Sequence, residues 1–203
     1  MYQNYIKNIL DRIFALIVLI ILSPIYIIIA LISKIIEPKG KVIFSQYRSG
    51  KDRKPFMCYK FRSMTMDAPK NESTYELKNA HNYITPFGSF LRRTSLDELP
   101  QIFNILKGDM SFVGPRPVIL KETKLLDLRE EKGACKVKPG ITGLSQISGR
   151  DNLGPRKKAE TDAIYANNVC FRNDLKIILL TIPNVLFSKG ITEGEQDIDD
   201  FEI

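Results

Sequence analysis

The chain opens with a long apolar segment and continues with short segments of mixed polarity. Residues 13–32 read IFALIVLIILSPIYIIIALI and carry no charge over twenty positions, which is the length of a helix across the hydrocarbon core of a bilayer. A secretory signal fits less well, because its apolar region is shorter and a small-residue cleavage site follows it. The pattern therefore predicts a membrane segment followed by a water-soluble domain.

Two features of this segment favour a re-entrant hairpin over a straight span. Pro24 lacks an N–H and disfavours helical geometry at Ser23, so the helix should break there, with the freed carbonyl of Ile20 within reach of the Ser23 hydroxyl. Each arm of about ten residues would reach about 15 Å, or one leaflet. Positive residues on both flanks favour two cytoplasmic ends. These residues are Lys7, Arg12, Lys34, Lys39 and Lys41. A kinked full span is the alternative.

The rest of the pattern predicts an α+β fold that is mainly helical with a small β-hairpin. Residues 42–47 and 56–61 are β-branched and aromatic, and a Ser-Gly-Lys-Asp turn lies between them. Residues 113–117 should form an extended corner, and residues 139–143 a tight turn. Proline and glycine positions bound the helices. The predicted helices are 86–93, 100–107, 118–132, 156–168 and 174–188.

The last predicted helix, 174–188, has one apolar face. Lys176 and Pro183 interrupt it, and it is too short to span a membrane. The face could pack against the core, or it could lie in the membrane interface as an interfacial amphipathic helix. Its residues are Leu175, Ile178, Leu179, Ile182, Val185 and Leu186.

Charge is distributed unevenly along the chain. Lys and Arg outnumber Asp and Glu by 30 to 23, and the surplus lies just after the apolar segment, where residues 34–70 hold ten bases and three acids. Such a stretch suits anionic lipid headgroups, and there is no nucleic-acid motif. The last thirteen residues hold six acids and no base. We therefore divide the chain into an anchor (1–38), a catalytic domain (39–190) and an acidic tail (191–203).

Cysteine and histidine usage excludes several classes of site. The three cysteines are scattered and the only histidine is His81, so neither a disulfide framework nor a zinc site is indicated. A Ser-His-Asp triad and the glycine-rich phosphate loops are also absent. A reducing, cytosolic environment fits the soluble part best.

The acidic pair Asp97-Glu98 allows two interpretations. Ser95 and Glu98 have the spacing of a helix capping box, which is a purely structural role. An adjacent Asp-Glu pair just after Arg92-Arg93 also suits phosphate chemistry, because carboxylates hold Mg²⁺, arginines neutralise phosphate oxygens and a carboxylate can attack phosphorus. Other basic residues lie on predicted turns or strands. These are Lys60, Arg62, Arg116 and Arg150. Together they favour a polyanion site.

Several stretches resemble the bacterial sugar transferases, the monotopic polyprenyl-phosphate phosphoglycosyl transferases. They are Ser23-Pro24, YKFRSM at 59–64, RRTSLDELPQIFNILKGDMSFVGPRP at 92–117, PGITGLSQISGR at 139–150, and Asp162 with Tyr165. The resemblance covers roughly residues 5–188, and the 92–117 block is its most specific part. The chain resembles the short form of the family, and the resemblance strengthens the prediction of a re-entrant helix.

The resemblance implies a reaction on the cytoplasmic face of the bacterial inner membrane. A sugar-1-phosphate would pass from a UDP-sugar to undecaprenyl phosphate, with UMP released, as the first membrane step of O-antigen, capsule or glycoprotein glycan synthesis. Asp97 would be the nucleophile and Glu98 would help to bind Mg²⁺ beside it. Downstream glycosyltransferases would be partners. The implied substrate-binding residues are Lys60, Arg62, Arg92, Arg116, Arg150, Asp162 and Tyr165.

Two departures from the family pattern affect the identity of the sugar. Relatives often have an aromatic residue after the PGITG turn, where this chain has Leu144-Ser145, and residues 151–156 read DNLGPR. Two other functions remain open on the residues alone. One is a non-catalytic membrane-anchored binding protein, and the other is a Mg²⁺-dependent lipid-phosphate hydrolase.

Overall fold

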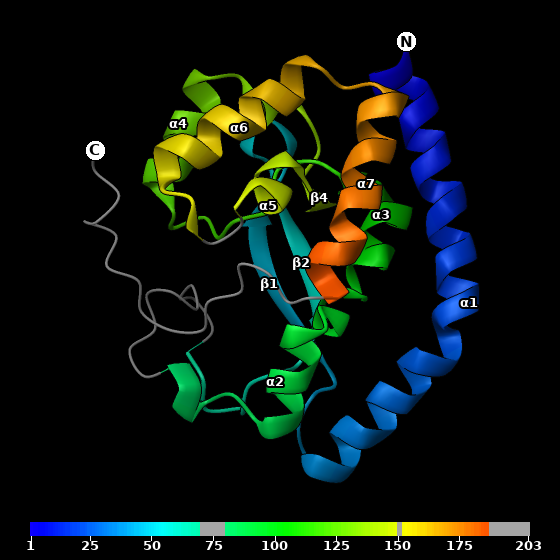
Figure 1. The fold of residues 1–203 in the computed structure, drawn as a ribbon. Helices are drawn as coiled ribbons and strands as arrows, with labels where there is room; N and C mark the ends of the chain where they lie inside the picture. The colour runs from blue at the N-terminus through cyan, green and yellow to red at the C-terminus, as the bar shows by residue number, and fades with distance from the viewer. Residues whose placement is uncertain (70–79, 150–151, 187–203) are drawn as a thin grey trace.

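The computed structural model describes residues 1–69, 80–149 and 152–186, and its main elements are helical (Figure 1). The helices are α1 (Lys7–Ile36), α2 (Pro86–Arg93), α3 (Gln101–Lys107), α4 (Thr123–Glu131), α5 (Leu144–Ser148), α6 (Pro155–Asn167) and α7 (Phe171–Leu186). The strands are β1 (Ile43–Ser49), β2 (Pro55–Phe61), β3 (Ser111–Val113) and β4 (Gly140–Thr142). The predicted α+β class is confirmed, whereas the acidic tail lies outside the described residues.

Helix α1 contains the whole apolar segment and runs through Ser23 and Pro24 without a break. Figure 1 shows that it bends near its middle and does not fold back on itself. The predicted break at Ser23 is therefore wrong. The expected compensation is present, because the Ser23 hydroxyl donates a 2.8 Å hydrogen bond to the carbonyl of Ile20, the group that Pro24 deprives of its donor. Proline-induced bending of this kind is the usual cause of a kink.

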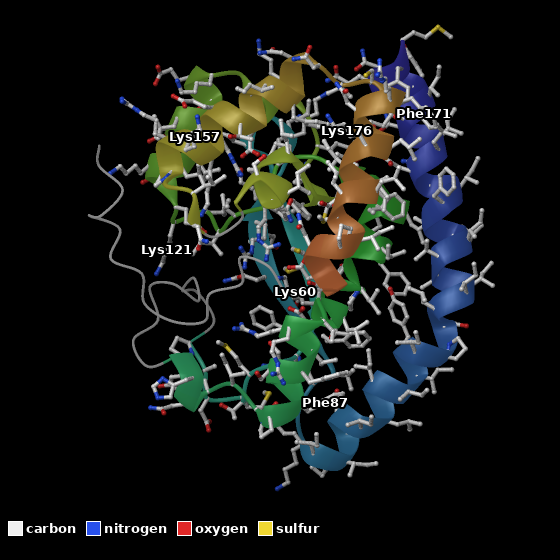
Figure 2. All side chains as sticks on the ribbon, viewed as in Figure 1. Lys60, Phe87, Lys121, Lys157, Phe171 and Lys176 are labelled. Atoms are coloured by element: carbon white, nitrogen blue, oxygen red, sulfur yellow. The ribbon has the colours of Figure 1, made fainter. Side chains whose placement is uncertain are left out.

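One face of α1 packs against the soluble domain and the other is exposed. Ala15 joins a core cluster with Ile102, Ile105 and other residues of the hairpin and α3, and Ile29 packs with Phe61. The opposite face leaves many large aliphatic side chains exposed, and they point outward in Figure 2. Helix α1 is the one described helix that is long and apolar enough to cross a membrane.

The predicted β-hairpin is confirmed. β1 and β2 pair antiparallel, from Ile43 opposite Phe61 to Ser49 opposite Pro55. β2 buries Phe56 and Cys58 against α3, because alternate residues of a strand point to the same face. This packing fixes the position of Lys60, which follows on the same strand, relative to α3.

The predicted turn at 139–143 is instead a strand. β4 pairs in parallel with β3, placing Gly140 opposite Ser111. The two backbones approach closely, since a Cβ added at Gly140 would lie 2.1 Å from the amide nitrogen of Gly114. A Pro-Gly pair is typical of turns, so local pattern alone could not reveal this long-range pairing.

The other helices confirm the predictions apart from their ends. Helix α4 starts at Thr123 rather than at 118. The preceding residues pair with the hairpin instead, because the Ser49 amide donates to the carbonyl of Val118 and Ile119 forms a β-bridge with Arg48. Helices α2, α3 and α6 lie within one residue of their predicted bounds.

Helix α7 leaves most of its predicted apolar face exposed. Leu175, Leu179 and Ile182 are 45%, 57% and 53% exposed, whereas Ile177, which is outside the predicted face, is buried. These three residues of the predicted face therefore do not pack into the core.

Candidate active site

The Asp97-Glu98 pair lies on a single 3₁₀ turn, Leu96–Glu98, between α2 and α3. Ser95 precedes the turn with a left-handed backbone, φ 56°. Both acidic residues are buried, with only 7% of Asp97 and 6% of Glu98 exposed. Because burying ionised carboxylates is costly unless cations accompany them, the turn must be stabilised by basic side chains from elsewhere in the fold.

Glu98 has those basic partners. Lys60 Nζ lies 2.9 Å and Arg116 Nη2 2.7 Å from the same oxygen, Glu98 Oε1. The capping-box interpretation is wrong, because the Ser95 side chain makes no capping hydrogen bond and its Oγ is buried without a partner among the described residues. The Ser-x-x-Glu spacing therefore serves an ion-pair cluster rather than a helix end.

The two carboxylates differ in their electrostatic environment. Burial raises the pKa of Asp97, although the Lys60 ammonium, 3.9 Å from Asp97 Oδ2, opposes the rise. Burial acts in the same direction on Glu98, but Arg116 and Lys60 outweigh it and hold the pKa of Glu98 well below its ordinary value. Environments that separate the pKa values of two neighbouring acids are typical of catalytic sites. Glu98 is thus a fixed negative charge, and Asp97 is the less stabilised carboxylate.

A cleft of about 90 Å³ opens at Asp97. Lys60 of β2 and Arg62, which directly follows that strand, line the cleft together with Arg92 of α2. Lys60 is labelled near the middle of the molecule in Figure 2. The structure therefore brings together three basic residues that the sequence predicted as phosphate ligands. Arg48 from β1, for which the sequence carries no signal, also lines the cleft.

Two of these guanidinium groups are held in place by neighbouring groups. Arg92 Nε donates to Ser63 Oγ at 3.0 Å. Arg62 Nε donates to the carbonyl of Lys41 at 2.9 Å, and the Arg62 guanidinium lies 5.6 Å from the centre of the Phe44 ring. Groups that are positioned before a ligand arrives lose less entropy on binding.

A buried ion pair between Arg129 and Asp162 holds the backbone of Arg116 in place. Arg129 Nη2 lies 2.6 Å from Asp162 Oδ2, and Arg129 Nη1 donates to the carbonyl of Arg116 at 2.9 Å. Ser145 donates to the other oxygen of Asp162 at 2.7 Å. Through Arg129, Asp162 therefore positions the segment that carries Arg116. Its other partner, Ser145, is one of the two residues, Leu144 and Ser145, at which this chain departs from the family pattern.

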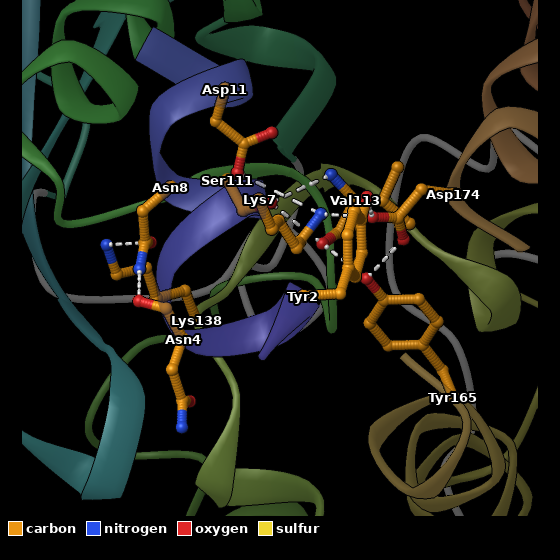
Figure 3. Close-up of polar contacts among 10 residues, drawn as sticks. All are labelled: Tyr2, Asn4, Lys7, Asn8, Asp11, Ser111, Val113, Lys138, Tyr165 and Asp174. Atoms are coloured by element: carbon orange, nitrogen blue, oxygen red, sulfur yellow. Dashed lines mark hydrogen bonds and ion pairs between the residues drawn. The ribbon is translucent and has the colours of Figure 1, made fainter. Parts of the chain in front are cut away.

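Tyr165 lies in a separate polar cluster where α1, α6 and α7 meet (Figure 3). Its hydroxyl donates to the carbonyl of Val113 at 3.0 Å and lies 2.7 Å from Asp174 Oδ1. Lys7 Nζ lies 2.6 Å from Asp174 Oδ2. The structure does not bring Tyr165 to the Asp97 cleft. Tyr165 contacts β3, the strand that precedes Arg116. Both predicted site residues of α6, Asp162 and Tyr165, therefore support the segment that carries Arg116.

The remaining predicted residue, Arg150, lies outside the described residues. Sequence reasoning missed Arg129 and Asp174, each a charged residue on an otherwise ordinary helix. The buried Lys7–Asp174 pair spans 167 residues, and no local pattern indicates a pair of that separation.

Comparison with known proteins now decides the family. A sequence profile described as bacterial sugar transferase matches residues 2–188. The chain belongs to the bacterial sugar transferase family. The expectation from the 92–117 block is thereby confirmed.

Three relatives show how the match is distributed. The chain is 46% identical over 154 residues to "Uncharacterized sugar transferase EpsL" of Bacillus subtilis, covering 75% of this chain and 73% of that protein. It is 37% identical to "Undecaprenyl-phosphate galactose phosphotransferase" of Salmonella typhimurium, covering 93% of this chain and 42% of that protein. It is 43% identical to "UDP-glucose:undecaprenyl-phosphate glucose-1-phosphate transferase" of Klebsiella pneumoniae, covering 87% and 39%. The chain thus spans about two fifths of the relatives whose names state an activity.

The carboxylates of this sugar transferase suit a hard divalent cation. Among the described residues no three His, Cys, Asp or Glu side chains gather as a metal site. Mg²⁺, however, is held in proteins by one or two carboxylates together with water and substrate phosphate oxygens. Asp97 and the second oxygen of Glu98 are the groups that fit this role, since Glu98 Oε1 already accepts from two cations.

Proposed function

We propose that this protein transfers a sugar-1-phosphate from a UDP-sugar to undecaprenyl phosphate, giving a polyprenyl diphosphate-sugar and UMP. The observation that supports it most directly is the buried Asp97-Glu98 pair with Lys60 and Arg116 on Glu98. The names of the Salmonella and Klebsiella relatives supply the chemical class of the acceptor and, for the latter, of the donor.

Asp97 is the nucleophile in this proposal. An oxygen of its carboxylate attacks the phosphorus that carries the sugar, the bond to the bridging diphosphate oxygen breaks, and UMP leaves with both electrons of that bond. An oxygen of undecaprenyl phosphate then attacks the same phosphorus and releases the Asp97 carboxylate. Asp97 suits the role because, among the described residues, no cation hydrogen-bonds to it as Lys60 and Arg116 do to Glu98.

The cationic lining of the cleft would serve the diphosphate. Arginine forms bidentate bonds with phosphate oxygens, and neutralising the charge that develops on the leaving group is the main requirement of phosphoryl transfer. Arg48, Arg62 and Arg92 have the position for it. Mg²⁺ held by Asp97 and Glu98 would add charge neutralisation at the same oxygens.

The contacts of α1 support a proposal for how the protein meets the membrane. Both halves of this helix contact the same soluble domain, through Lys7 with Asp174 near one end and Ile29 with Phe61 and Leu91 near the other. A helix that crossed the bilayer would carry one end away from that domain. We therefore propose a re-entrant, bent α1 with both ends on the cytoplasmic face, and α7 lying in the interface through its exposed face.

Cysteine labelling tests this topology. Single cysteines at Tyr2 and Lys39, in a chain whose Cys58, Cys135 and Cys170 are replaced by serine or alanine, should both react with a membrane-impermeant maleimide only from the cytoplasmic side of sealed vesicles. A cysteine at Asp127, an exposed position on α4, is the control for the cytoplasmic side. Labelling of the two ends from opposite sides would rule out the re-entrant arrangement.

A product assay tests the function itself. Purified protein with Mg²⁺, undecaprenyl phosphate and a panel of UDP-sugars should release UMP and form a lipid-linked diphosphate-sugar from at least one donor. Free sugar phosphate as the product would instead identify a hydrolase. No turnover of any UDP-sugar would favour a non-catalytic binding protein. The lipid product would be the substrate of downstream glycosyltransferases in glycoconjugate synthesis.

A further inference from the structure

A second cavity, of about 240 Å³, lies between the membrane helix and the last helix. Val18 of α1 forms one side, and Thr181 and Asn184 of α7 form another. The turn and α3 supply a third side that includes Glu98. The cavity therefore extends from Glu98, one member of the acidic pair, to the two helices that carry exposed apolar faces.

Half of the twelve lining residues are aliphatic or aromatic. They are Val18, Leu99, Ile102, Phe112, Ile141 and Ile147. A hydrophobic cavity of about 150 Å³ in another protein accommodates benzene, so this one has room for one or two five-carbon units of a branched hydrocarbon. It is too small for a long chain, which would have to continue outside it.

Polar atoms without partners line the same cavity. Ser95 Oγ and Gln146 Oε1 are buried and have no hydrogen-bond partner among the described residues, and both residues line the cavity. The other polar groups of Gln146 and Thr181 are satisfied, by the carbonyl of Ile141 at 2.8 Å and by Thr142 Oγ1 at 2.6 Å. A buried polar atom without a partner costs free energy, and the Ser95 hydroxyl would recover it by donating to an oxygen of a ligand's polar end.

The apolar surface continues outward from the cavity. Ile17 and Ile21, which flank Val18 along α1, are 44% and 67% exposed, and Leu180, beside Thr181 on α7, is 43% exposed. A hydrocarbon chain that left the cavity between these helices would meet apolar side chains rather than water. That path suits a ligand whose head is polar and whose tail belongs in a bilayer.

We propose that this cavity binds the first isoprene units of the polyprenyl phosphate acceptor, with its phosphate end toward Ser95 and Glu98. The inference rests on the proposed function and specifies the acceptor side of the same site. Asp97 lines the donor cleft and its neighbour Glu98 lines this cavity, and the two spaces have no lining residue in common. The nucleotide and the lipid would therefore approach the pair from separate sides.

Filling the cavity tests the proposal. Val18→Phe should raise the KM for undecaprenyl phosphate about tenfold, because the ring occupies the space of buried isoprene carbons, and should leave the KM for the UDP-sugar unchanged. The same rise is expected with a two-unit isoprenyl phosphate, since only the first units enter. Leu16→Phe is the matched control, because Leu16 is 52% exposed on the other side of α1 from Val18, and it should change either KM less than about twofold.

A second variant guards against a folding defect in the first. Asn184→Phe fills the same cavity from α7 and should reproduce the lipid-specific effect. A rise in the lipid KM no larger than that of Leu16→Phe in both filled variants would overturn the proposal. So would an equal rise in the KM of both substrates.

Direct labelling separates this inference from the proposed reaction. A photoreactive two-unit isoprenyl phosphate, added to the full chain in phosphatidylglycerol nanodiscs, should label peptides of α3 or α7, and Val18→Phe should reduce that labelling at least about fivefold. If the wild type turns over no UDP-sugar, the proposed function fails while the labelling still decides the cavity. Equal competition by a saturated alkyl phosphate would overturn the isoprenoid assignment.

Discussion

Asp97→Asn is expected to reduce transferase activity by more than about a thousandfold, because the amide cannot form the acyl-phosphate bond. The change is nearly isosteric, and it leaves the contacts of Glu98 with Lys60 and Arg116 in place. UMP release and lipid product should both disappear, since they depend on the same attack. Wild-type UMP release by the purified variant would contradict the nucleophile assignment.

Stability provides the second measurement for this variant. Burial raises the pKa of Asp97, so the folded state stabilises its charged form less well than water does. Removing that charge should leave the melting temperature unchanged or raise it, as is common when a functional group is replaced. Asp127→Asn is the matched control, because its ion pair with Arg53 is exposed and contributes about 0–1 kcal/mol.

A trapping experiment distinguishes a covalent role from an electrostatic one. Wild-type protein incubated with UDP-sugar and no acceptor should gain the mass of one sugar phosphate, and Asp97→Asn should not. If Asp97→Asn lost turnover but the wild type formed no adduct, direct transfer would be favoured, with Asp97 acting through its charge alone.

The sequence predicted those features of the fold that depend on local pattern. The hairpin followed from β-branched and aromatic residues around a polar turn, and α3 from proline at one end and glycine at the other. What it missed depends on distant pairing. Gly140 lies in a strand because Gly114 leaves room for it, and residues before Thr123 pair with β1 rather than extend α4.

The candidate site was predicted through residue types, and its supports were not. Lys60, Arg62 and Arg92 were identified as basic groups, and the structure places all three around Asp97. Their arrangement relies on a second set of residues whose charges look like ordinary surface charges in the sequence. Arg129 is the clearest case, because only its burial beside Asp162 distinguishes it from the exposed Arg53.

The capping-box error has a physical cause. Ser95 and Glu98 have the right spacing, but that spacing says nothing of what else approaches the carboxylate. Two cations from β2 and the 113–117 segment reach Glu98, and charge-assisted bonds of this kind are stronger than a hydrogen bond from a backbone amide. The ion-pair cluster therefore determines the geometry of the turn.

Asp162→Asn is expected to be strongly destabilising, by about 3–5 kcal/mol, because it leaves the buried Arg129 charge without its partner. Asp162 is 1% and Arg129 6% exposed, so water cannot replace the lost carboxylate. Urea denaturation of the purified chain measures the change. Glu160→Gln on the same helix is the matched control, since its pair with Lys132 is partly exposed and should contribute less than about 1 kcal/mol.

Replacing both partners separates stability from function. Asp162→Leu combined with Arg129→Met removes both buried charges, and apolar substitutes for a buried pair are often neutral or stabilising. The double variant should therefore regain most of the lost stability. Its activity should stay low, with a raised KM for the UDP-sugar, because the Arg129 bond to the carbonyl of Arg116 is gone. Full activity in the double variant would show that Arg116 needs no support from behind, and that Asp162 serves stability alone.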